Sequence, residues 1–178
     1  MPDVGGTGPG RVRSGWREPT SRLSLRWASY RSRYLAGLAL VLVGGLLVQF
    51  TSTYSLAVLP IGIALHVTGW CILPGVGWRR VLASAVGALT TIVMLNGAPA
   101  TVFLAFPLAA WLFVRQRPPV SYVVLAVPLL ASIPLAQSFP DYGWGAVVLP
   151  IAGVVVAGSA WLARSLAAMS GISSASTR

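Results

Sequence analysis

The amino-acid sequence predicts an all-α polytopic integral membrane protein with about six transmembrane helices, arranged as three helical hairpins. Of the 178 residues, 56% are hydrophobic and only 9% are charged, whereas a soluble domain carries about 25% charged residues. The hydrophobic stretches are close in length to the roughly 20 residues with which a helix crosses the hydrocarbon core of a bilayer. The net charge of +10, from 13 basic and 3 acidic residues, lies outside these stretches.

The chain before the first hydrophobic stretch divides into two segments. Residues 1–20 are rich in glycine and proline, which predicts a disordered cytoplasmic tail. In residues 21–33, Leu23, Trp27 and Tyr30 recur at helical spacing, which predicts a basic amphipathic juxtamembrane helix. Its arginines allow two interpretations: they contact lipid headgroups, or they only hold the N-terminus on the cytoplasmic side. The candidate headgroup contacts are Arg22, Arg26, Arg31 and Arg33.

The six predicted spans form a transmembrane domain over residues 34–164, followed by a cytoplasmic C-terminal tail over residues 165–178. Residues 81–114 contain no charge and are too long for one crossing, so the chain must fold back. The turn-forming residues Asn96, Gly97 and Pro99 predict the corner. The predicted spans are residues 34–50, 54–74, 77–95, 99–114, 119–137 and 144–163.

The distribution of arginine predicts the orientation. With six spans and a cytoplasmic N-terminus, every arginine falls on the cytoplasmic side and Asp141 lies in an outside loop, in agreement with the positive-inside rule. A five-span alternative, with residues 81–114 as one re-entrant unit, would place the arginines of its two flanks on opposite faces. All basic residues are arginine, which we interpret as the bias of a GC-rich bacterial genome. The predicted location is the bacterial cytoplasmic (inner) membrane, with both termini inside.

The sequence offers little for chemistry. No acidic residue falls within a predicted span, and the chain has one histidine and one cysteine, which excludes carboxylate relays and metal clusters within a monomer. We therefore expect no catalytic, cofactor-binding or metal-binding residues, no cofactor and no enzyme activity. Cys71 is predicted to be a small buried hydrophobic residue.

His66 is the candidate functional polar residue within the membrane. One interpretation makes it a ligand-binding or proton-responsive group, or one axial haem ligand whose second histidine would have to come from a dimer. The other makes it a neutral imidazole bonded to a neighbouring hydroxyl or carbonyl group. Small residues at helical spacing predict faces for helix packing, and these are Gly62, Gly69, Ala83, Gly87, Gly153 and Ala157.

Three functions remain open on the sequence. The leading one is a non-catalytic accessory or structural subunit that packs against another membrane protein, because the spans carry small-residue faces and almost no ionisable groups. The alternative is a small-solute carrier or channel working as a homo-oligomer, favoured by His66 and the prolines within the spans. A membrane enzyme or cytochrome is a remote third. The expected partners are the lipid bilayer and another membrane protein or a second copy of the chain. Nucleic acid is not expected, because no recognition fold fits the basic N-terminal segment.

Overall fold

The computed structural model describes residues 28–52 and 54–176, which are helical throughout apart from short connections and contain no strand. Within these residues the chain forms six α-helices, and 3-10 segments lie in the last three connections between them. The α-helices are α1 (Tyr30–Gln49), α2 (Val58–Ile72), α3 (Gly77–Val93), α4 (Ala105–Val114), α5 (Ala126–Ser138) and α6 (Gly145–Ser176). The 3-10 segments are η2 (Met94–Asn96), η3 (Ala98–Leu104), η4 (Pro119–Leu125) and η5 (Tyr142–Trp144).

The helix ends follow from local sequence. Ser29 caps α1, because its side-chain oxygen accepts a hydrogen bond from the Ser32 amide at 3.2 Å, which satisfies one of the unpaired amides of the first turn. Between α3 and α4 the chain reverses at Gly97, whose φ of +82° lies in the left-handed region that glycine adopts most easily. Pro99 then opens η3, where its missing amide costs no hydrogen bond.

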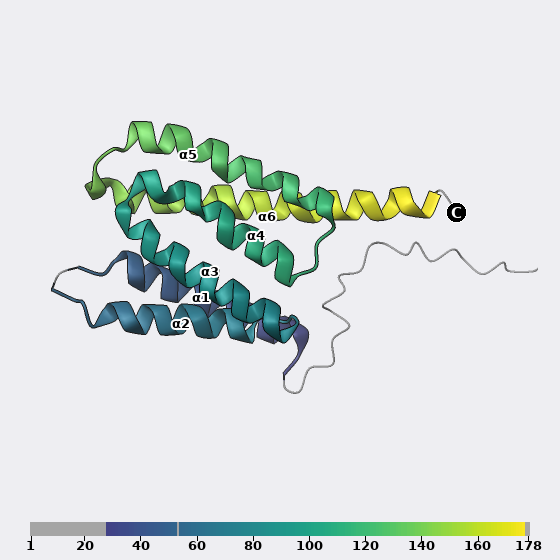
Figure 1. Cartoon of the computed structure of the whole chain (residues 1–178), viewed down its shortest axis with the longest axis horizontal. Helices are drawn as coiled ribbons and strands as arrows, with labels where there is room; N and C mark the ends of the chain where they lie inside the picture. Colours follow the sequence, from purple (N-terminus) through teal and green to yellow (C-terminus); the bar gives the residue numbers. More distant parts are fainter. Residues whose placement is uncertain (1–27, 53, 177–178) are drawn as a thin grey trace, which may run out of the picture.

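The helices run in alternating directions along the long axis of the molecule (Figure 1). The closest pairing is between α1 and α2, and α2 also contacts α3. The second half of the bundle contains α4, α5 and α6, in which α5 packs against η3 and α6 packs against η4 and α5. Contacts between α3 and α4 join the two halves.

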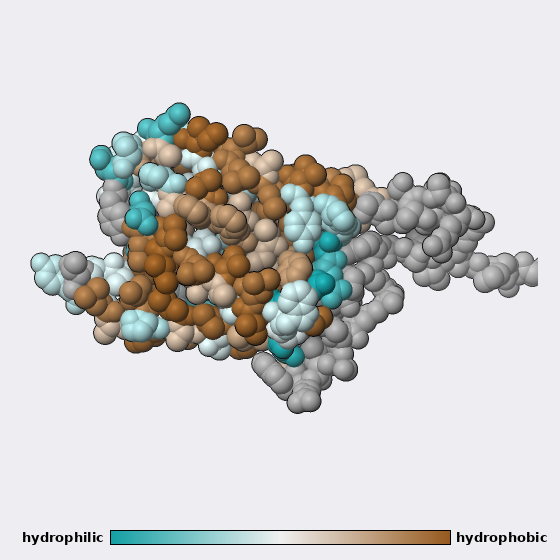
Figure 2. Space-filling model, in the orientation of Figure 1, coloured by the Kyte–Doolittle hydropathy of each residue, from teal (hydrophilic) through white to brown (hydrophobic). Residues whose placement is uncertain are grey.

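Four helical segments are long and apolar enough to cross a membrane, which indicates a membrane protein. They are Tyr30–Gln49, Gly77–Asn96, Pro119–Ser138 and Gly145–Met169. The other two apolar segments, Val58–Ile72 and Ala98–Val114, are shorter. Many large hydrophobic side chains are exposed on the outside of the bundle. Figure 2 shows apolar residues over the middle of the visible face, as expected for a surface that meets lipid.

Three helices differ from their expected lengths. The first helix begins at Tyr30, so residues 30–33 belong to α1 and not to a separate juxtamembrane helix; residues 21–27 of that prediction lie outside the described residues. The second helix begins only at Val58, because Ser52 and Ser55 form a hydrogen-bonded turn before it. The last helix continues past residue 163 to Ser176. The predicted disordered tail, residues 1–20, also lies outside the described residues.

Charge is divided between the two ends of the bundle. The structure describes seven arginines, and the loops and helix ends that carry six of them lie at the end where α1 begins (Figure 1). The seventh, Arg164, lies within α6 and lines the same cavity as Arg115 and Arg117. Asp141, the only acidic residue in the described part of the chain, lies in the α5–α6 loop at the opposite end. The seven arginines are Arg31, Arg33, Arg79, Arg80, Arg115, Arg117 and Arg164.

Candidate functional site

The backbones of α1 and α2 touch at two pairs of glycines. A Cβ atom added to Gly37 would lie 2.9 Å from the Gly69 carbonyl oxygen, and one added to Gly44 would lie 2.5 Å from the Gly62 carbonyl oxygen. Both distances are too short for any residue with a side chain. The predicted packing residues Gly62 and Gly69 are therefore placed against α1, where the small residues allow the two helices to approach closely.

His66 lies between these two glycines on α2, in the centre of the first three helices. Its side chain is only 6% exposed. The Nδ1 atom is 2.9 Å from the Val41 carbonyl oxygen of α1, and the Trp70 Nε1–H group donates to Nε2 at 3.0 Å. Since a carbonyl can only accept and an indole N–H can only donate, the pattern corresponds to a neutral imidazole with its proton on Nδ1.

Helix α3 completes the surroundings of His66 with small and hydroxyl-bearing residues. A Cβ atom on Gly87 would lie 2.8 Å from His66 Nε2 and 2.5 Å from Trp70 Nε1, so this glycine makes room for both rings. The Thr91 hydroxyl lies 3.5 Å from Nε2 and donates to the Gly87 carbonyl at 2.8 Å. The imidazole thus hydrogen-bonds to α1 and to Trp70 of its own helix, and it lies against Gly87 and Thr91 of α3.

Two further predictions concern Ala83 and Cys71. Ala83 is buried on α3, in a cluster with Trp70 of α2 and Leu73, which directly follows α2. Cys71 is exposed, and the prediction that it is buried is wrong. One residue further along a helix is a rotation of about 100°, which turns Cys71 away from the interior that holds Trp70. Within the described residues no group of three or more His, Cys, Asp or Glu side chains could hold a metal ion.

Gly153 and Ala157, on α6, are not brought against another of the helices that the structure describes. Both are exposed, and a Cβ atom added to Gly153 would meet nothing within 4 Å. Gly158, which follows Ala157, is equally open. The helix-packing face expected here is therefore open in the structure, unlike the faces that carry Gly62, Gly69 and Gly87.

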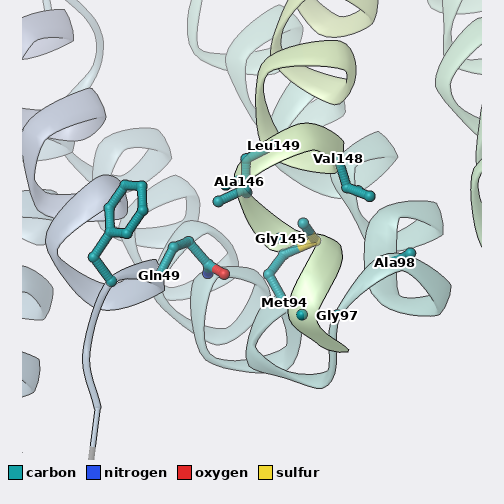
Figure 3. Close-up of a pocket in the computed structure, with 10 residues that line it drawn as sticks. Gln49, Met94, Gly97, Ala98, Gly145, Ala146, Val148 and Leu149 are labelled. Carbon is teal, nitrogen blue, oxygen red and sulfur yellow. The ribbon is translucent and has the colours of Figure 1, made fainter. Parts of the chain in front are cut away.

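A cavity of about 210 Å³ lies at the end of the bundle opposite the arginines, where the end of α1 and the α3–α4 turn meet the start of α6 (Figure 3). Its walls include Met94, Ala98, Val148 and Leu149. The side-chain amide of Gln49, which also lines it, donates to the Thr91 carbonyl at 2.9 Å. The amide therefore serves to join α1 to α3.

The arginines at the end of the bundle where α1 begins have roles that the sequence analysis missed. Arg33 is only 7% exposed, and its Nε donates to the Ile72 carbonyl, at the end of α2, at 3.2 Å. Arg80 donates to the Cys71 carbonyl at 2.6 Å, and Arg79 donates to the Phe113 carbonyl near the end of α4 at 2.9 Å. The last carbonyls of a helix have no partner within it, and cations are favourable there.

These contacts change the interpretation of the four candidate headgroup arginines. Arg33 Nε is bonded to the end of α2, and the headgroup contact expected of this residue stays a prediction. Arg31 is exposed on α1. Arg22 and Arg26 lie outside the described residues. The sequence could have indicated the helix-end contacts of Arg79 and Arg80, because both residues come shortly after the expected end of the second span.

No known protein family, curated protein or solved structure matches this chain.

Proposed function

We propose that this chain is a non-catalytic accessory or structural protein of the bacterial cytoplasmic membrane that packs through α6 against a second membrane protein. All six helices would cross the bilayer, with the arginine end and both termini on the cytoplasmic side. The observation that carries the proposal is the open small-residue face of α6, made of Gly153, Ala157 and Gly158.

The other small residues of the bundle supply the comparison. A Cβ atom added to any of three other glycines would lie within 3 Å of a neighbouring helix; these are Gly44, Gly62 and Gly87. In a membrane, lipid tails are as apolar as leucine, so small residues gain their value from close contact between helices. An equivalent set that faces outward on α6 fits a helix that the described residues of this chain do not supply.

The hydrogen bonds that the buried polar side chains make within the bundle support a non-catalytic role. His66 is bonded to α1 and to Trp70, and Thr91 and Gln49 bond to backbone carbonyls. Ionisable residues that serve transport or proton transfer in membranes usually face a water-filled path or each other. His66 instead bonds α2 to α1 and packs against α3, which favours the accessory role over the carrier.

Site-specific photo-cross-linking in native membranes tests the proposal. A photoreactive residue at Ala157 should give one discrete adduct with a second protein, whereas the same residue at Ala64, which is exposed on α2, should give none. In a second experiment, Gly153→Leu should weaken the Ala157 adduct strongly, because the added side chain fills the face.

Two outcomes would contradict the proposal. An adduct with the mass of two copies of this chain would favour the homo-oligomeric carrier or channel. The absence of any discrete adduct at Ala157, with the protein correctly inserted, would leave the α6 face to lipid and remove the basis for the proposal.

A further inference from the structure

A second and larger cavity, of about 610 Å³, lies at the arginine end between α1, α4 and α6. Three arginines and three aromatic residues line it together with two alanines of α6. We propose that this cavity binds a phosphate-bearing anion, and that its ligand in the membrane is the headgroup of an anionic phospholipid. The six residues are Arg115, Arg117, Arg164, Tyr34, Trp111 and Trp161.

The end of α4 orients two of the arginines. Gln116 has a φ of +53°, and its amide and that of Arg117 donate to the Phe113 and Leu112 carbonyls at 3.2 and 3.0 Å. This pattern is a Schellman motif, which ends a helix with a residue in the left-handed region. The motif reverses the chain between Arg115 and Arg117 and leaves both side chains on the wall of the cavity.

Aromatic contacts hold the Arg115 guanidinium in place. It lies 4.6 Å from the ring centre of Tyr34 and 5.0 Å from that of Trp111, and it donates to the Tyr30 hydroxyl at 3.0 Å. Arg117 is 8% exposed and lies 5.8 Å from the Trp111 ring. These contacts fix the position of positive charge before a ligand arrives, which lowers the entropy cost of binding.

The net charge of the chain favours an anionic ligand. There are 13 basic residues and 3 acidic ones, so most arginines cannot be neutralised by an acidic side chain of the same chain. Asp141 lies at the far end of the bundle. Arginine binds phosphate through two parallel hydrogen bonds, and anionic headgroups are the abundant phosphates at the cytoplasmic surface of a membrane.

The rest of the lining favours a lipid over free phosphate. Trp161 is 71% exposed on α6, and Leu162 next to it is 42% exposed, so the cavity adjoins an apolar surface. Tryptophan is typical of the membrane interface, where headgroups and acyl chains meet. A free phosphate would use only the arginines, whereas an anionic lipid would also use the aromatic rings and the apolar surface beside them.

Lipid titration of the purified full-length protein in a neutral detergent tests this inference. Short-chain phosphatidylglycerol is the probe, tryptophan fluorescence gives the Kd, and native mass spectrometry gives the stoichiometry. We expect one tightly bound phosphatidylglycerol and much weaker binding of short-chain phosphatidylcholine. Arg164→Gln should raise the Kd about tenfold, as for the loss of a charge-assisted hydrogen bond, and Arg164→Lys should raise it less. Arg164 is exposed, so neither variant should impair folding.

Arg31→Gln is the matched control, because Arg31 is exposed on α1 at the same end but does not line the cavity. Its Kd should change less than about twofold. An equal effect of Arg31→Gln and Arg164→Gln would show diffuse attraction by charge and overturn the site. Equal binding of phosphatidylcholine would do the same. Displacement of phosphatidylglycerol by inorganic phosphate at a similar concentration would assign the site to free phosphate and overturn the lipid assignment.

Discussion

At the scale of single residues, His66 shows what one sequence can and cannot reveal. Its place among small residues predicted burial, but the sequence left open whether it binds a ligand or a neighbour. Its partner Val41 lies on another helix, which no local pattern indicates. Trp70 lies four residues after His66, and residues at this spacing are neighbours on one face of a helix, so the sequence could have indicated this contact. The error at Cys71 has a related cause: in a membrane, hydrophobicity is the same for the interior and the lipid-facing side.

A double-mutant cycle can measure the bond between His66 and Trp70. His66→Phe and Trp70→Phe each remove one partner, and each should lower the free energy of unfolding in detergent by about 1–2 kcal/mol. The double variant should lose about 1 kcal/mol less than the sum, because the shared hydrogen bond can be lost only once.

Trp144→Phe provides the control for this cycle, since Trp144 ends η5 just before α6, far from His66 in the chain, and packs against Phe139. Its effect should simply add to that of His66→Phe. Additive behaviour of the His66 and Trp70 variants as well would argue against a bond that contributes to stability.

At the scale of elements, the pairing of α1 with α2 follows from glycine spacing. Gly37 and Gly44 are seven residues apart, as are Gly62 and Gly69, so the pairs meet in reverse order when the helices run antiparallel. The sequence analysis named only the two glycines of α2. The equal spacing on two successive hydrophobic segments was the signal that could have found the other two. The 3-10 segment η4 before α5 and the arginine contacts at helix ends depend on neighbours that are distant in the chain. No spacing of residues in the sequence predicts them.

Adjacent glycines of α1 provide a sharp test of this contact. Gly44→Ala should destabilise the protein by about 2–3 kcal/mol, because the new methyl group would meet the backbone of α2, which cannot move aside cheaply. Gly45→Ala places the same methyl group 3.6 Å from His66 Nδ1, an ordinary contact. It should be neutral or stabilise by up to about 1 kcal/mol through helix propensity.

Thermal unfolding in the same detergent checks both glycine variants against the unaltered protein. Equal melting temperatures for Gly44→Ala and Gly45→Ala would mean that the backbones of α1 and α2 are not in contact.

At the scale of the whole molecule, composition was sufficient to predict an all-helical protein with apolar surfaces. The described residues contain the expected six helices, and four segments are long enough to cross a membrane. Helix lengths were less predictable. Hydropathy does not predict the Ser52–Ser55 turn, after which α2 begins later than expected. It also does not predict that α6 continues beyond its hydrophobic part. The orientation in the membrane stays a prediction.

Cysteine labelling tests this orientation. In a Cys71→Ala background, a cysteine at Asp141 should react with an impermeant maleimide added outside intact cells. A cysteine at Gln116, in the α4–α5 loop, should react only after the cells are opened. Detergent-solubilised protein, in which both positions are accessible, controls for reactivity. Equal labelling of both positions from outside would rule out the six-span arrangement.

The length of α6 has a geometric consequence. Its 32 residues correspond to about 48 Å of helix, whereas the hydrocarbon core is about 30 Å thick. If α6 crosses the bilayer along its normal, about 18 Å of helix extends into the headgroup layer and beyond. Figure 1 shows this segment continuing past the ends of the other helices. A domain attached there would be held at a set height above the lipid, and each inserted residue would raise it by about 1.5 Å and turn it by about 100°.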